Sequence, residues 1–460
     1  MHSIIRRTLF AAGAAACVAA PSNAQRIPAP DPAAAAAQGR LIDAAMKDSA
    51  AWERLALMVD TYGNRPSGSK RLEDALDWIV AQMKKDGLDN VHTEPVMVPH
   101  WERGAESVVM LSPRLDTLHM LGLGLSVGTP PAGITAPVLV VTSFADLRAH
   151  AAEARGKIVL YDVAFDTTKT PFEAYGGAVI YRGVGADSAQ QFGAVAMLVR
   201  SVTPVSLRSP HTGALRPAAD STKRIPAAAL SVEDAMMLHR MQARGQKVTL
   251  TLKMGAHMLP PAPSRNVVAE VRGTERPNEV VIVSGHIDSW DVGQGAMDDG
   301  GGAVASWEAV RLIKQLGLHP RRTVRVILWT NEESGLAGGR AYAEAHKAEF
   351  KDIVLAMESD NGVFAPKGFQ VAGGDSLIPS LRAVIAPLAR VGVTTVSKGE
   401  SEADVSPMFA AGVPVGSVDT DASRYFWYHH TQADTPDKLD PRAMAAVVAT
   451  LAAVAYGTAW

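Results

Sequence analysis

Two adjacent carboxylates, Glu332 and Glu333, follow directly after the apolar run VRVILW in the segment WTNEESG. The length and the β-branched content of this run are typical of a buried parallel strand. In an open α/β sheet, ligands bind beyond the carboxyl ends of the strands. We therefore expect both acids at a sheet edge where a binding site can form.

Three further apolar runs of the same half, VVIVSG, IVLAMES and VPVGSVD, are also followed by acids or imidazoles. The side chains after these runs are His286, Asp288, Asp298, Asp299, Asp360, His429 and His430. Taken alone, each Asp is most simply a helix cap or turn residue, and each His an ordinary core or surface residue. Taken together, they are harder to explain as ordinary cap, turn or core residues. Carboxylates crowded on one edge repel one another unless a cation neutralises them.

The donor types indicate which cation would bind. Cys17 is the only cysteine of the chain, so thiolate ligands and disulfides are excluded once the N-terminal segment is removed. Imidazole and carboxylate donors without thiolate suit Zn²⁺ or a similar first-row divalent ion. A shared carboxylate can bridge two ions roughly 3.5–4 Å apart. The sequence therefore predicts a two-metal hydrolase.

Four segments in this order, GHIDSWDVGQGAMDDGGG, NEESGLAGG, ESDNG and YHHTQADTPD, resemble the co-catalytic zinc exopeptidases of peptidase family M28. The segment VPHWERGAESVVML and a strand-rich insert narrow the resemblance to one branch of that family, whose insert is a protease-associated domain. The resemblance implies a secreted exopeptidase with two Zn²⁺ ions per subunit that cleaves short peptides, with dipeptides as the expected substrates. It also suggests a homodimer. The alternatives are an aminopeptidase on longer peptides, a glutaminyl-cyclase-like acyltransferase and a non-catalytic binding protein.

The resemblance implies five metal ligands, namely His286, Asp298, Glu333, Asp360 and His430. Asp298 would bridge the two ions, and His286 and Glu333 would be terminal ligands on opposite ions. Asp288 would be the carboxylate that fixes the imidazole of His286. Glu332 would act as the general base, because adjacent side chains point in different directions and Glu333 can bind metal while Glu332 faces the attacking water.

Three positions are left open by the sequence. Many family members carry SDH where this chain has EADVSP, so Asp404 is assigned no role beyond packing near the site. The oxyanion donor is not identified, and Tyr425 and Tyr428 are its candidates. Of the adjacent histidines, His430 is preferred because the family ligand directly precedes the pattern T..DT, and His429 is the alternative.

The elements that must position these residues follow from the hydrophobic pattern. Strands alternate with helices beyond residue 257, which predicts an α/β fold with a doubly wound, mostly parallel sheet and helices on both faces. Residues 132–256 contain short strands separated by turns, with a loop expected at TKTPFEAYGG, and are interpreted as an inserted β-rich protease-associated domain. Residues 25–131 would be the first part of the peptidase domain, and residues 257–460 its metal-binding part.

Composition and the two ends of the chain complete the sequence-based expectations. The net charge is −2 and no polybasic block occurs, which argues against a nucleic-acid partner. Residues 1–24 combine a basic start, an apolar stretch and small residues, as in a cleaved signal peptide, so we expect a secreted or periplasmic protein, with lipid attachment at Cys17 as the alternative. Residues 443–460 carry no charge but are rich in alanine, and we expect a buried core helix rather than a stable transmembrane span.

Overall fold

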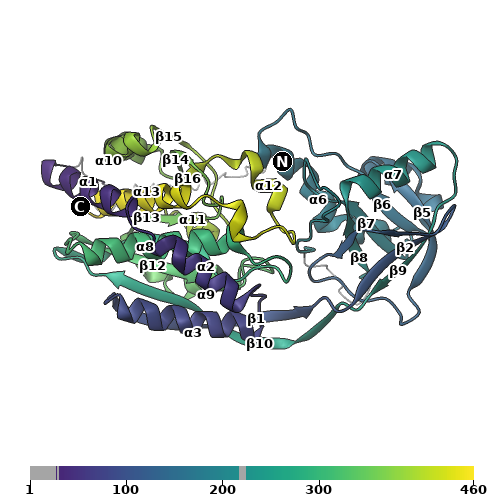
Figure 1. Cartoon of the computed structure of the whole chain (residues 1–460), viewed down its shortest axis with the longest axis horizontal. Helices are drawn as coiled ribbons and strands as arrows, with labels where there is room; N and C mark the ends of the chain where they lie inside the picture. The colour runs from purple at the N-terminus through teal and green to yellow at the C-terminus, as the bar shows by residue number, and fades with distance from the viewer. Residues whose placement is uncertain (1–26, 28–30, 217–223) are drawn as a thin grey trace, which may run out of the picture.

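The computed structural model describes residue 27 and residues 31–216 and 224–460. The expected signal peptide and Cys17 lie outside the described residues. Two modules are joined by a long antiparallel ribbon of β1 (Asp89–Glu102) and β10 (His257–Val271), which runs along the lower edge of Figure 1. We call residues 31–102 and 257–460 the first module, and residues 106–254 the second module.

The first module is built on a mixed eight-stranded sheet in the order β1-β10-β12-β11-β13-β16-β14-β15. Its remaining strands are β11 (Arg276–His286), β12 (Arg322–Trp329), β13 (Ile353–Glu358), β14 (Pro366–Ala372), β15 (Thr395–Lys398) and β16 (Val415–Thr420). β12, β11, β13 and β16 are neighbours and all parallel. The predicted α/β fold is confirmed, although β10 and β14 pair antiparallel with their neighbours β12 and β16.

Apolar side chains cover both faces of this sheet because strand residues alternate between faces. Val281 and Val283 of β11 belong to the larger core, and Val280 and Ile282 belong to a second core on the opposite face. The helices of the module are α1 (Pro32–Ala45), α2 (Ala50–Tyr62), α3 (Lys70–Lys85), α8 (Gly301–Gln315), α9 (Ala337–Ala345), α10 (Ile378–Ile385), α11 (Ser406–Ala410), α12 (Tyr425–Tyr428) and α13 (Pro441–Ala459). Short turns of helix are η3 (Ala296–Gly300), η4 (Lys347–Asp352), η5 (Asp375–Leu377), η6 (Ala386–Val391), η7 (Ala422–Arg424) and η8 (Pro436–Lys438).

The uncharged C-terminal segment forms α13, a helix of the larger core. Asp440 caps it by accepting the N–H groups of Arg442 and Ala443 at 2.7 and 3.2 Å. It packs against α1, α8 and α10. α13 is the one helix of the described residues long and apolar enough to cross a membrane, but 83% of its apolar window is buried. This burial agrees with the predicted core helix.

The second module has its own mixed eight-stranded sheet, in the order β3-β2-β9-β5-β6-β7-β8-β4. Its strands are β2 (Glu106–Ser112), β3 (Asp116–Leu118), β4 (Met120–Gly122), β5 (Ile134–Val141), β6 (Ile158–Tyr161), β7 (Ala196–Arg200), β8 (Ala227–Leu230) and β9 (Thr249–Met254). The sheet begins at Glu106, before residue 132, because β2 pairs with β9 and β3, and β4 pairs with β8, all of them strands of this module.

The second module also contains helices that the strand-rich interpretation did not include. They are α4 (Phe144–Ala149), α5 (Ala151–Ala154), α6 (Pro171–Gln190) and α7 (Val232–Ala243). The expected loop TKTPFEAYGG is wrong, since most of it is the start of α6. Thr170 and Glu173 form a capping box with Pro171 at the first helical position, a local helix-start signal that outweighs the turn-like composition.

Candidate metal centre

The predicted site residues meet at one edge of the first sheet. Glu332 and Glu333 follow β12, His286 is the last residue of β11, and Asp360 follows β13. The next strand, β16, leads through α12 into His430. Because these four strands are parallel neighbours, their carboxyl ends place side chains from distant parts of the sequence together.

Asp298 lies between two imidazoles, with one carboxylate oxygen toward each. Its Oδ1 is 3.3 Å from His286 Nε2, which is 3.6 Å from Asp360 Oδ1. Its Oδ2 is 3.2 Å from His430 Nε2, which is 3.1 Å from Glu333 Oε2. The other four predicted ligands thus form two groups, one on each oxygen of Asp298.

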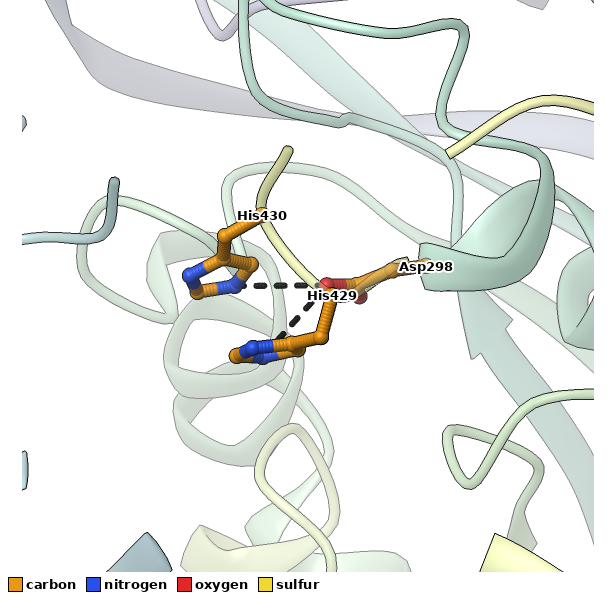
Figure 2. Close-up of side chains that lie close together, drawn as sticks. All are labelled: Asp298, His429 and His430. Carbon is orange, nitrogen blue, oxygen red and sulfur yellow. Dashed lines mark ion pairs between the residues drawn. The ribbon is translucent and has the colours of Figure 1, made fainter. Parts of the chain in front are cut away.

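His429 also approaches this carboxylate, as the dashed lines of Figure 2 show. Its Nε2 lies 3.6 Å from Asp298 Oδ2, and its ring stacks on that of His430 with centroids 3.5 Å apart. The rings of Tyr175 and Tyr425 also contact the His429 ring. His430 approaches both Asp298 and Glu333, so its position is the more central of the two.

Several buried polar atoms of this cluster lack a hydrogen-bond partner among the described residues. They are His286 Nε2, Asp298 Oδ2, Glu333 Oε1 and Asp360 Oδ1. Burial raises the pKa of Glu333 to about 7 and raises the pKa of Asp360 above its ordinary value. Burying several unneutralised carboxylates is costly, and a cation removes that cost. The donor set of imidazoles and carboxylates therefore fits divalent ions such as Zn²⁺.

The carboxylate of Asp288 lies between the backbone of Glu332 and the ring of His286. Its Oδ1 accepts the N–H of Glu332 at 3.0 Å, and its Oδ2 accepts the hydroxyl of Ser67 at 3.2 Å. His286 Nδ1 lies 3.0 Å from the carbonyl oxygen of Asp288 but 3.8 Å from its carboxylate. The backbone carbonyl of Asp288 is thus the nearer group to the ring, and the role of its carboxylate in fixing the imidazole stays a prediction.

Glu332 and Glu333 make different contacts. Both line a cavity of about 250 Å³, but Glu333 is paired with His430 whereas the N–H of Glu332 is held by Asp288. Burial raises the pKa of Glu332 well above its ordinary value. Tyr425, one of the two tyrosines considered as an oxyanion donor, lines the same cavity.

Asp404 is fully buried near the site, and its N–H donates to Glu358 Oε2 at 3.0 Å. Glu358 is the last residue of β13, two residues before Asp360. Asp404 therefore packs behind a strand that carries a predicted ligand.

Asp434 holds the segment that carries Asp298, a function that the sequence analysis missed. Its carboxylate accepts the N–H groups of Ala296, Met297 and Asp298 at 3.0, 2.6 and 3.2 Å. Asp434 is buried, and it lies in the same HTQADT segment as His430. Its position close to a predicted ligand in the sequence was the indication that Asp434 has a role at the site. The fold shows which backbone groups it binds.

Arg65 is a second missed residue, and no local pattern in its turn NRPSGS indicates its role. It is fully buried and donates to four backbone carbonyls around the site, those of Gly63, Ile287, Gln294 and Gly295, at 2.7–2.9 Å. Burial lowers its pKa to about 10. The guanidinium therefore links the chain before α3 to Ile287, which follows β11, and to Gln294 and Gly295, which precede η3.

We expect Arg65→Met to lower the thermal unfolding midpoint by several degrees. The variant leaves four carbonyls without this donor, and each buried acceptor left unsatisfied costs about 1–3 kcal/mol. The measurement is thermal unfolding followed by circular dichroism. Arg71→Met is the matched control, because Arg71 is exposed and contacts Asn64 at the surface. Equal midpoints for the two variants would contradict the assigned role.

Comparisons with known proteins agree with this geometry. The model of peptidase family M28 matches residues 266–455, which include all the predicted ligands. Carboxypeptidase Q of Homo sapiens is 48% identical over 405 residues, covering 88% of this chain and 84% of that protein. The crystal structure of an M28 peptidase precursor from Shewanella amazonensis has a TM-score of 0.88 at 35% identity and covers 93% of this chain and 97% of that one. An aminopeptidase from Aneurinibacillus, with a TM-score of 0.66 at 20% identity, covers 92% of this chain and 96% of that one and shares the fold. The chain therefore belongs to peptidase family M28, in which it is a metallopeptidase similar to carboxypeptidase Q.

Proposed function

We propose that this protein is a di-zinc exopeptidase that hydrolyses short peptides, with free dipeptides as its preferred substrates. One observation carries the proposal, namely that the two oxygens of Asp298 face two separate ligand groups. His286 and Asp360 would complete one site, and Glu333 and His430 the other. A carboxylate shared in this way is what a pair of ions roughly 3.5–4 Å apart requires.

The chemistry then divides between the ions and the chain. Zinc bound by these residues would polarise the scissile carbonyl and lower the pKa of the attacking water. Glu332 accepts the proton of that water and then donates it to the leaving amine. Tyr425 lines the same cavity, its hydroxyl donates to the carbonyl oxygen of Asp360 at 3.4 Å, and it is the proposed donor to the developing oxyanion. Asp288 positions Glu332 through the 3.0 Å bond to its N–H.

The cavity supports a short substrate with a free C-terminus. Its volume of about 250 Å³ lies below the range of about 300–1,000 Å³ found for drug-sized ligands. α6 of the second module supplies one wall through Phe172, Tyr175 and Arg182. Arg182 is the one lysine or arginine among the residues that line this cavity, and a guanidinium pairs well with a carboxylate. We assign it to the substrate's C-terminal carboxylate, and the second module to the protease-associated insert of the family.

Export is part of the same proposal. Residues 1–24 would direct the chain to the periplasm or the exterior, and the absence of cysteine after Cys17 suits an enzyme that forms no disulfide there.

The test uses the mature protein loaded with Zn²⁺, with a chelated sample alongside. Four peptides are followed by mass spectrometry: a free dipeptide, its N-blocked form, its C-amidated form and a pentapeptide. We expect chelator-sensitive cleavage of the free dipeptide only. We also expect Arg182→Gln to raise KM for that dipeptide by about 10- to 100-fold, since a hydrogen bond to a charged group contributes about 1.5–3 kcal/mol.

Two controls separate the parts of this proposal. Arg244→Gln changes an exposed arginine of the same module and should leave KM unchanged. Stepwise loss of N-terminal residues from the pentapeptide would show an aminopeptidase instead. No cleavage of any peptide by zinc-loaded protein would contradict the enzymatic proposal.

A further inference from the structure

A loop of the second module contacts His430 through backbone atoms at two points. The N–H of Thr212 donates to the carbonyl oxygen of His430 at 3.0 Å. His430 Nδ1 lies 3.2 Å from the carbonyl oxygen of Thr212. Thr212 is fully buried, and 218 positions separate the two residues in the sequence. In Figure 1, α12 of the first module lies beside α6 of the second module.

The second of these contacts determines which ring nitrogen can bind a metal. A carbonyl oxygen only accepts hydrogen bonds, so a hydrogen bond between these two atoms requires the proton on Nδ1. In a neutral imidazole Nε2 is then the free lone pair, and Nε2 is the atom that faces Asp298 and Glu333 at 3.2 and 3.1 Å. Histidines that bind metals usually donate their other N–H in this way, and loss of the acceptor weakens metal binding.

Arg182 strengthens the same arrangement. Its Nη1 donates to the carbonyl of Thr212 at 3.2 Å, so one oxygen accepts from both Arg182 and His430. The guanidinium also lies beside the ring, with Nη1 at 3.4 Å from His430 Nδ1.

The loop that contains Thr212 and Gly213 is held in place by hydrogen bonds within the second module, independently of His430. Thr212 Oγ1 donates to the carbonyl of Gly122 at the end of β4, at 2.7 Å. The carbonyl of Gly213 accepts the N–H of Gly124 at 3.0 Å. Gly213 has a φ of +138°, and a Cβ there would overlap the guanidinium of Arg182. Glycine is therefore required for the loop and Arg182 to occupy this space together.

We propose that Thr212 is a positioning residue for His430. The second module then contributes to metal binding at the site formed by Glu333 and His430, because it holds the ring of one ligand. This inference rests on the proposed role of His430 as a ligand. It goes beyond that role because it makes one metal site, and not the other, depend on a loop of the inserted module. His286, in the other site, is oriented by the carbonyl of Asp288 within the first module.

The test measures metal binding by Gly213→Ala, which strains the loop at a φ of +138° and displaces the guanidinium that donates to the carbonyl of Thr212. Metal-free protein is titrated with Co²⁺ while visible absorption is followed, and bound zinc is counted by mass spectrometry after dialysis. We expect one ion to bind as in the parent and the other to bind at least about 10-fold more weakly, the usual loss when the partner of a ligand is removed. The thermal midpoint of the metal-free protein is measured for each variant.

Gly245→Ala is the matched control. Gly245 lies in the same module with a φ of +73°, and a Cβ there would meet nothing within 4 Å, so the variant carries the backbone strain without moving the loop. It should bind two ions as the parent does. If Gly213→Ala does not fold, Thr212→Val, which removes the bond to Gly122, is measured by the same criterion.

The outcomes separate this inference from the proposed function. If a folded loop variant binds both ions with parental affinity while His430→Ala loses one, the positioning role of Thr212 is wrong and the proposed function stands. If His430→Ala keeps both ions, His430 is not a ligand, and both proposals fail. Selective loss of one ion in the loop variant and in His430→Ala supports both.

Discussion

Glu332→Gln is expected to keep both zinc ions and to lower kcat by about 10²–10⁴-fold, the usual contribution of a positioned general base. The amide has nearly the same shape as the carboxylate but cannot accept a proton. Glu332 follows β12 directly, and its N–H is fixed by Asp288 Oδ1 at 3.0 Å. Its side chain lines the cavity, whereas the ion pair with His430 is made by Glu333. The change therefore removes proton transfer without removing a ligand.

The measurement pairs kcat for a free dipeptide with zinc content by mass spectrometry. Glu344→Gln, an exposed position on α9, is the matched control and should behave as the parent. Normal turnover in Glu332→Gln would rule out Glu332 as the base. Loss of zinc together with turnover would instead assign Glu332 to the ligand set.

Asp298→Ala is expected to lose both zinc ions and all measurable turnover. The other ligands divide into two groups, and Asp298 is the residue that approaches both imidazoles, at 3.3 Å from His286 and 3.2 Å from His430. Removing it leaves each site with one imidazole and one carboxylate, fewer than the three protein ligands of a simple catalytic zinc site.

Thermal unfolding with and without chelator gives a second measurement of the same effect. Zinc that binds the folded state raises the midpoint of the parent, and this zinc-dependent rise should vanish in Asp298→Ala. Asp360→Ala should keep part of the rise, because Glu333 and His430 remain on the other oxygen of Asp298. Asp375→Ala is the control, since Asp375 is exposed. An undiminished rise in Asp298→Ala would contradict the bridging role.

Most of the first module was predictable because its signals are local. The apolar runs that became β11, β12, β13 and β16 are long enough to be recognised as buried strands, and strand–helix alternation implies a parallel arrangement. The carboxyl ends of parallel strands share one edge, so the sequence order alone placed His286, Glu333 and Asp360 together. The second module was harder, since turn-like composition around Thr170 concealed a capping box.

The residues that hold the site could not be predicted in the same way. Arg65 and Thr212 act through backbone carbonyls, which every residue has, so nothing in the sequence marks their partners. The carboxylate of Asp288 was expected beside an imidazole, and its hydrogen bond to the N–H of Glu332 was not foreseen. Such contacts depend on the path of the chain in space.

The sequence by itself therefore determined the α/β architecture of the first module, the edge at which chemistry occurs and the types of donor available there. These follow from periodicity and composition, which act over a few residues. The tertiary structure alone decided that Asp298 presents one oxygen to each imidazole, and that the ring of His430 contacts the backbone of Thr212, a residue of the second module. Both depend on how segments far apart in the chain pack against one another. The free energy of that packing comes from many residues together, so no short segment of the sequence predicts it.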